Sequence, residues 1–367
     1  MDVQLPAELW LQIGGHLPRA DLNRLVRTGH ALHSLLLPLL HRAIILSGPY
    51  RFATGHAKRL QSIRDTLARI GAKFELVTAI RSCTFQRVEG TLLEEAIAFL
   101  GTLPNLSSLL LKDLTLEANQ LIRLSKSWRS PIEFVSDTVN VEPFDLPPSI
   151  IKGTPPNLSS LIITDVKCFY TSWRLFVQWS FSANLEIMEI GADIIMLKAL
   201  FEEHISSLPK VSFPRLKSLR LSALPGLGNQ GRFFDCMPML ENLDLTTFSQ
   251  NLNISEMAIP RLRRYGGPGT VISSLVPRRP IRHLNISWGD DLPTLWGSRT
   301  SPILNFGSTS TIRYLHLPPT QHPLRSLQLV TVACPSLYEL KLTCHRRFHF
   351  SEVSLQILAF HCLTRIN

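Results

Sequence analysis

Two short stretches, Leu216–Leu221 (LKSLRL) and Leu240–Leu245 (LENLDL), carry the pattern that decides the fold of this chain. In each stretch apolar residues stand at the first, fourth and sixth positions. The fourth and sixth positions have one residue between them, so in a strand their side chains point to the same side. The side chain at the first position packs beneath them. A strand that buries only one such face needs neighbouring strands of the same kind.

The same pattern recurs through most of the 367 residues. Its copies, of which the one at Leu262 is degenerate, begin at Leu106, Leu158, Leu185, Leu216, Leu240, Leu262, Ile281, Ile312, Leu337 and Leu355. Successive starts lie 18 to 31 residues apart, with one gap of 52. A leucine-rich repeat, which is one strand followed by one helix, takes about 20–29 residues. The spacing therefore predicts an irregular leucine-rich-repeat array.

The segments between copies fit this α/β class. Apolar periodicity predicts helices over Thr91–Leu100, Ile194–Leu208 and Leu324–Ala333, and earlier strands over Ala43–Leu46 and Leu76–Phe85. Two stretches interrupt the rhythm: the proline-rich 125–160, interpreted as an extended insertion, and 266–282, interpreted as a Gly- and Pro-rich loop. Each is either a neutral insertion or a binding loop.

Composition narrows the class of protein. Leucine accounts for 62 of the residues, which suits a helical bundle or a leucine-based repeat. Hydrophobic residues at 45% and charged residues at 18% exclude a mostly disordered chain. The longest apolar run, residues 31–46, is broken by polar residues and by Pro38, so we expect no membrane span. The net charge of +10 is scattered, with no basic run longer than two, so we expect no nucleic-acid partner.

The first 46 residues follow a helical period instead. Leu5-Pro6 is followed by apolar residues every four positions at Leu9, Ile13 and Leu17, and Pro18 ends that helix. Two more short helices are predicted to end near residues 28 and 40. Three such helices cannot bury all of their leucine among themselves, so the surplus must meet the rest of the chain or a partner.

The order of residues here, LP-x-E-L-x3-I-x3-LP-x2-DL-x2-L, resembles an F-box. The repeats after it resemble the irregular leucine-rich repeats of fungal F-box proteins. The resemblance implies a three-helix F-box domain over 1–46 and a strand–helix solenoid over 47–367. It also implies docking to a Skp-type adaptor, and through it to a cullin. The alternative is a helical cap for the repeats and nothing more.

The resemblance implies which residues meet each partner. The adaptor contacts would come from Leu5, Pro6, Leu9, Ile13, Leu17, Pro18 and Leu22. Sequence does not separate these contacts from residues that pack the helices together. A target protein would lie on the concave strand face, on the positions Arg220, Asn242, Asp244, His283, Asn285, Tyr314, His316, Glu339 and Lys341.

Other motifs point only weakly to chemistry. Gly226, Gly228 and Gly231 form a G-x-G-x-x-G, but the strand before them is one repeat among many. The cysteines and histidines near the C-terminus contain no C-x2-C pair that would indicate zinc. We therefore expect no enzyme activity, no metal and no cofactor.

The predicted function is that of a substrate receptor in a Skp–cullin–F-box ubiquitin ligase, in the cytoplasm or the nucleus. The alternative is a leucine-rich-repeat scaffold outside any ligase. Sequence does not name the target. Two arginine groups, Arg261/Arg263/Arg264 and Arg278/Arg279/Arg282, are candidates for binding acidic or phosphorylated motifs. Spacing alone does not show that either group forms a pocket.

Overall fold

The computed structural model describes residues 5–48, 56–142, 156–165, 167–168, 170–191, 213–223, 230–247, 254–276, 279–287, 311–320, 330, 334, 336–344 and 353–356. The chain forms two compact units, Met1–Ser182 and Ala183–Asn367. Within the described ranges, no helix is both long and apolar enough to cross a membrane.

The first unit begins with three short helices, α1 (Ala7–His16), α2 (Arg19–Val26) and α3 (His30–Leu40). Their shared core contains Leu22, Val26 and Leu36, each 5% exposed or less. Gly14 is buried in α1, and a Cβ atom there would lie 3.0 Å from Leu39 and 3.1 Å from Leu36. The glycine therefore lets α1 approach α3 closely.

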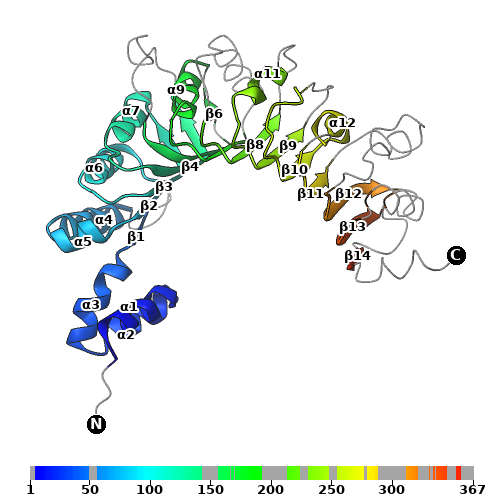
Figure 1. Ribbon diagram of the computed structural model, residues 1–367. Helices are drawn as coiled ribbons and strands as arrows, with labels where there is room; N and C mark the ends of the chain where they lie inside the picture. The colour runs from blue at the N-terminus through cyan, green and yellow to red at the C-terminus, as the bar shows by residue number, and fades with distance from the viewer. Residues whose placement is uncertain are drawn as a thin grey trace. The chain divides into compact units, whose positions relative to one another are not determined.

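A parallel sheet follows these helices and has the order β1-β2-β3-β4-β5, with β6 beside β4. Its strands are β1 (Ala43–Ser47), β2 (Ser82–Gln86), β3 (Ser108–Leu116), β4 (Ile132–Val141), β5 (Leu158–Thr164) and β6 (Lys167–Cys168). The helices between them are α4 (His56–Gly71), α5 (Phe74–Ala79), α6 (Gly90–Leu100) and α7 (Ala118–Lys126), and α9 (Tyr170–Ser180) follows β6. Helices α4 to α7 lie along one side of the strands (Figure 1).

In-register pairing stacks the apolar positions of this sheet. Leu109 of β3 is paired with Cys83 of β2 and with Phe134 of β4, and Phe134 is paired with Leu161 of β5. All four side chains have 0% exposure. Burial raises the pKa of the Cys83 thiol to about 12, so this cysteine is a core residue rather than a reactive one.

The second unit repeats the same arrangement. Seven of its described strands run parallel in the order β7 to β13, and they are β7 (Ile187–Gly191), β8 (Ser218–Ala223), β9 (Asn242–Thr247), β10 (Arg264–Gly267), β11 (His283–Ile286), β12 (Tyr314–Thr320) and β13 (Glu339–Cys344). The described helical segments are α11 (Gln230–Asp235), the 3-10 turn η1 (Gly269–Val271) and α12 (Ile272–Leu275). The fourth position of each motif is buried and faces its counterpart on the next strand, as with Leu219, Leu243 and Tyr265.

These features confirm the α/β class and the repeat of strand and helix predicted from the spacing. Parallel, in-register strands with buried leucines and intervening helices are the architecture of leucine-rich repeats. The predicted strand at Ala43–Leu46 and the predicted helix at Thr91–Leu100 are both present. Residues 43–46, which the predicted division grouped with the helices, are part of the sheet. The predicted helix at 194–208 and most of the one at 324–333 lie outside the described residues.

One expected insertion is partly a repeat. Residues 132–141, within the stretch interpreted as an insertion, form strand β4 between β3 and β5. This strand divides the 52-residue gap into two ordinary repeats, because Phe134 lies between Leu109 and Leu161 in register. Sequence analysis missed it because buried Ser136 occupies the sixth motif position, where a leucine is expected.

Two other predicted strands are wrong in part. Within the predicted strand at 76–85, residues 76–79 belong to helix α5 (Phe74–Ala79), and only residues 82–85 belong to strand β2 (Ser82–Gln86). Leu76, Val77 and Ile80 are all buried, which is a helical spacing rather than a strand spacing. The last copy, at Leu355, is not a parallel repeat strand either. Strand β14 (Val353–Gln356) pairs with β13 in the antiparallel direction.

Candidate binding faces

The exposed side of the strands in the second unit forms a hollow, which we call the strand face. Its volume is about 490 Å³. All nine positions predicted to contact a target line it, and they are Arg220, Asn242, Asp244, His283, Asn285, Tyr314, His316, Glu339 and Lys341. The structure therefore brings together residues that are spread over more than 120 positions of the sequence.

The lining residues stand in two columns because the strands are in register and alternate residues share a side. The first column runs Ser218, Asn242, Arg264, His283, Tyr314, Glu339. The second column runs Glu189, Arg220, Asp244, Gly266, Asn285, His316, Lys341. Strands β7 to β13 contribute one residue each to the second column, so the face forms only when all of these strands are paired.

At one end of the strand face, one arginine forms ion pairs with two carboxylates. The Arg220 guanidinium donates to Glu189 through Nη1 at 3.0 Å and to Asp244 through Nε at 3.1 Å. These hydrogen bonds, first to Glu189 and then to Asp244, raise the pKa of Arg220. Gly266 borders the same carboxylate, since a Cβ atom there would lie 3.1 Å from Oδ1 of Asp244. The absence of a side chain at Gly266 leaves room for the Asp244 carboxylate.

Aromatic rings cover the other end of the face. His283 and Tyr314 are stacked with ring centroids 4.2 Å apart and an angle of 2° between their planes. Tyr338 meets Tyr314 edge-on at 5.9 Å and is 55% exposed. Stacked rings of this kind form a flat platform with polar rims, on which a partner side chain can pack.

The pKa of His283 is lowered from its usual value of 6.5, chiefly by burial and then by the charges of Arg264 and Arg282. Glu339 acts in the opposite direction.

We expect the imidazole titration of His283, followed by NMR, to have its midpoint below 6.5 and to shift upward in Arg282→Ala. Because the folded-state pKa is below the unfolded one, His283 reduces stability as the pH falls below about 6.5. In Arg215→Ala, a control outside the face, the midpoint should not move; equal midpoints in both variants would contradict the assignment.

Three polar or aromatic lining residues, Glu189, Arg264 and Tyr265, were not predicted from the spacing, and neither was Gly266. Glu189 stands between the two inward residues of its motif, in the slot that Arg220 occupies on the next strand. Choosing the residue between two inward positions, as was done for Arg220, would also have selected Glu189. The other three belong to the degenerate copy at Leu262, where Tyr265 replaces a leucine. Tyr265 is buried and its hydroxyl donates to the carbonyl of Pro268 at 2.9 Å.

The three N-terminal helices sort the predicted adaptor residues into two groups. Leu22 is 5% exposed and packs the core, and Leu17 is half-buried against that core. Leu5, Leu9 and Ile13 are 39%, 42% and 40% exposed. Leu9 and Ile13 are about one helical turn apart and so form an outward ladder on α1, and Leu5 lies two residues before the helix. Pro6 and Pro18 are exposed and directly precede α1 and α2.

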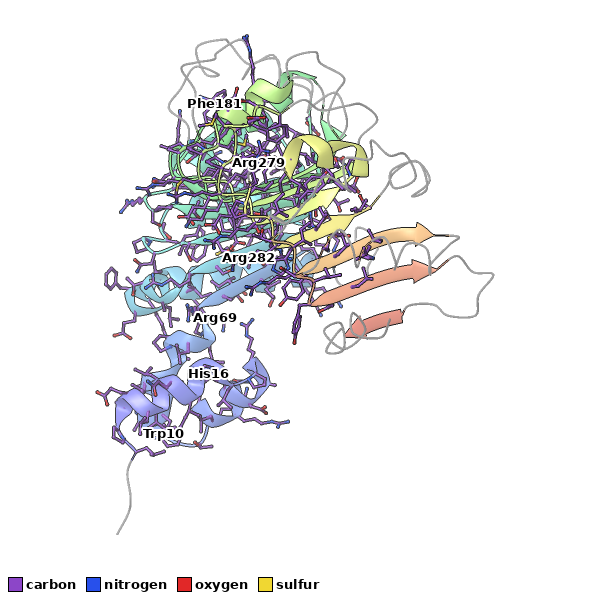
Figure 2. All side chains as sticks on the ribbon, turned by 45° about the vertical axis from the view of Figure 1, so that its right-hand side comes forward. Trp10, His16, Arg69, Phe181, Arg279 and Arg282 are labelled. Atoms are coloured by element: carbon purple, nitrogen blue, oxygen red, sulfur yellow. The ribbon has the colours of Figure 1, made fainter. Side chains whose placement is uncertain are left out.

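Trp10 and Gly14 of α1, together with Leu17 directly after the helix, pack against the core that α2 and α3 share. Trp10 lies within this three-helix end of the chain (Figure 2). Helix α1 therefore has one buried side, and the ladder of Leu9 and Ile13 lies exposed along the border of that side. Leu22 cannot be an adaptor contact while the helices are folded, because its side chain is enclosed.

The two arginine groups proposed for acidic motifs are not equivalent. Arg279 is buried, and its guanidinium donates to the carbonyls of Ser255, Ala258 and Leu275 at 2.6, 3.0 and 2.8 Å. Arg279 lies beside α12, whereas Arg282 lies just before β11 (Figure 2). Arg278 lies outside the described residues. Arg279 is thus an internal clamp, which corrects its assignment as a ligand-binding candidate.

The described residues add no support for the G-x-G-x-x-G motif or for a zinc site. Within the described ranges, no group of three or more His, Cys, Asp or Glu residues is arranged to hold a metal ion. Gly226 and Gly228 of the G-x-G-x-x-G lie outside these ranges, as do the histidines and the cysteine after residue 344. Asp244, the acidic residue that follows this motif, is held by Arg220 on the strand face.

The chain has a distant structural likeness among solved structures. The chain is similar to a solved structure described as the crystal structure of a TLR13–ssRNA13 complex, with 15% sequence identity and a TM-score of 0.44. The match covers 84% of this chain and 44% of that one, so the chain spans less than half the length of that structure. No protein-family model and no curated protein matches the sequence.

Proposed function

We propose that this protein is a substrate receptor of a Skp–cullin–F-box ubiquitin ligase. The observation that carries the proposal is the exposed apolar ladder of Leu9 and Ile13, preceded by exposed Leu5, on a helix whose neighbouring side is already packed. An apolar helix ladder exposed to water is typical of a surface that a groove on a partner covers. The F-box resemblance of the same residues identifies that partner as a Skp-type adaptor.

In this role the protein performs no chemistry of its own. The adaptor and its cullin hold the receptor, and the strand face holds a target beside the enzyme that transfers ubiquitin. Holding both on one assembly raises the effective concentration of the target at that enzyme. The hollow strand face supports this division of labour, because it offers ion pairs, amides and a stacked aromatic platform for a protein ligand.

The adaptor is tested with the full chain and a purified Skp-type adaptor. We expect the wild type to retain the adaptor in a pull-down and Leu9→Asp/Ile13→Asp to lose at least about 30-fold in affinity, as when central apolar anchors are removed. Leu11→Asp is the matched control. Leu11 is 40% exposed on the same helix but points away from the ladder, at about 200° from Leu9. An adaptor that binds neither chain, or equal losses in the ladder variant and the control, would refute the proposal.

A second candidate is a scaffold outside any ligase, in which the helices only cap the repeats. The continuity of the helices with the sheet favours it: α3 packs on α5, and the carbonyl of Arg42 accepts hydrogen bonds from Arg81 and Ser82. Terminal caps of repeat arrays pack in this way. Affinity purification from cells distinguishes the two, because the scaffold would bring down a partner without an adaptor or a cullin.

A further inference from the structure

Four arginines meet at the edge of the strand face where strands begin. Arg263, Arg282 and Arg313 directly precede β10, β11 and β12, and Arg264 is the first residue of β10. The amide of Arg282 donates to the carbonyl of Arg263 at 2.8 Å, and the amide of Arg313 donates to that of Arg282 at 2.9 Å. These hydrogen bonds place the three residues on adjacent strands. We call the four residues the arginine column.

The positive charge of the column is largely unbalanced. All four side chains are exposed. Arg263 has Glu241 at 3.8 Å, but no carboxylate within the described part of the chain forms an ion pair with Arg264, Arg282 or Arg313. Elsewhere along the same edge a cation is paired, as Lys217 is with Glu186 at 2.8 Å. The lowered pKa of His283, to which Arg264 and Arg282 contribute, is consistent with this local positive field.

We propose that the arginine column binds an acidic segment of a target protein, one that presents two closely spaced negative groups. The inference rests on the proposed receptor function, because the column borders the face assigned to the target. Guanidinium groups form paired hydrogen bonds with both carboxylates and phosphates. The shared chemistry is therefore a pair of anions, supplied by Asp and Glu side chains or by phosphorylated residues.

The spacing of the column suits an extended peptide. Adjacent strands lie about 4.8 Å apart, so the first and third arginines of the edge are separated by about 10 Å. In a peptide with the polyproline II conformation, which has three residues per turn and a rise of about 3.1 Å per residue, two side chains three residues apart point to the same side and lie about 9 Å apart. The stacked rings of His283 and Tyr314 lie next to the column and offer a surface for the residues between or beside the two anions.

The charges around the column favour a protein over a nucleic acid. Glu241 stands at one end of the arginine edge, and Glu339 and Asp244 lie on the neighbouring columns. A polynucleotide carries a phosphate at every nucleotide, so its path beyond three strands would pass these carboxylates. A peptide can limit its negative charge to two residues and place neutral or basic side chains over the acidic positions.

The test uses the full chain and four probes: degenerate peptide libraries with two phosphoserines, two glutamates or two serines fixed three residues apart, and a mixed-sequence single-stranded RNA of 20 nucleotides. We expect one or both anionic libraries to be retained at least about tenfold more than the serine library, and the difference to shrink at high salt. The library that is retained more strongly identifies the source of the negative charge.

Two double variants with the same loss of charge locate the binding. Arg282→Ala/Arg313→Ala should abolish the preference for anionic peptides, whereas Arg215→Ala/Lys217→Ala, at the start of β8, should preserve it. Equal retention of the anionic and serine libraries, or equal effects of the two variants, overturns the proposal. Retention of the RNA in place of the peptides also overturns it. Neither double variant alters the adaptor ladder, so adaptor binding is scored separately and the two proposals can fail independently.

Discussion

Replacing Trp179 with alanine is expected to destabilise the first unit by about 3–5 kcal/mol, the usual cost of removing a large aromatic side chain from a core. Trp179 of α9 is 2% exposed. Its ring meets Phe134, Trp128 and Phe176 edge-on at 5.1, 5.3 and 5.4 Å between centroids. Each such aromatic pair adds about 0.5–1.5 kcal/mol beyond the buried area, so the effect belongs at the upper end of the range.

The consequence should be local as well as large. The four rings join α9 to strand β4 and to the residues after α7, so hydrogen exchange should accelerate in these segments. Urea unfolding followed by circular dichroism gives the loss of free energy, and hydrogen exchange places it in the sequence. Trp179→Phe keeps an aromatic ring in the site and should cost clearly less. A loss below about 1 kcal/mol in Trp179→Ala would show that the cluster does not organise this part of the unit.

Replacing Arg279 with methionine is expected to cost about 3 kcal/mol or more, because hydrogen bonds from a charged donor contribute about 1.5–3 kcal/mol each and buried acceptors would lose their partner. The side chain is 6% exposed and joins Ser255 and Ala258, which precede β10, to Leu275 of α12. Burial lowers the pKa of this arginine, and the attraction of Glu256 partly offsets that effect. The guanidinium is therefore held in place by a precise set of carbonyl partners.

Arg282→Met is the matched control for this prediction, since it removes the same charge three residues later from an exposed side chain. Its free energy of unfolding should stay within about 0.5 kcal/mol of wild type. Arg279→Lys should resemble Arg279→Met more than wild type, because one ammonium group cannot span three carbonyls. Thermal or urea unfolding of the three variants measures the ranking. Equal effects of Arg279→Met and Arg282→Met would contradict the clamp.

Periodicity was enough to predict most of the described strands and to group nine residues that line the strand face. An in-register parallel stack places the residue between two inward leucines on the outer side of every strand, so Arg220, Asp244 and Asn285 share one column whatever lies in the loops. The rule failed where the motif itself changed. In β4, Ser136 stands at a motif position where a leucine is expected, so the strand was not predicted. In β10, Tyr265 and Gly267 stand at two such positions, so Arg264 was not assigned to the face.

In the three N-terminal helices, the sequence predicted the helices but not which apolar residues are buried. Seven apolar or proline residues in register suggested an adaptor surface, but periodicity treats Leu22 and Leu9 alike. Only packing separates them, since Leu22 is enclosed by α1 and α3 while Leu9 is left outside. Gly14 is a further case: in isolation it weakens a helix by about 1 kcal/mol. Here it allows the close contact with Leu36 and Leu39 that holds α1 in place.

The sequence by itself determined the repeat of strand and helix, because alternating buried side chains leave a periodic pattern that each repeat carries locally. The tertiary structure decided which side chains serve a partner and which serve the core. That decision depends on neighbours distant in the chain: Arg279 and Arg282 are three residues apart, yet one is enclosed by three carbonyls and the other joins Arg263 and Arg313 across neighbouring strands. Contact between separate repeats, rather than residue type, sets the role of each arginine.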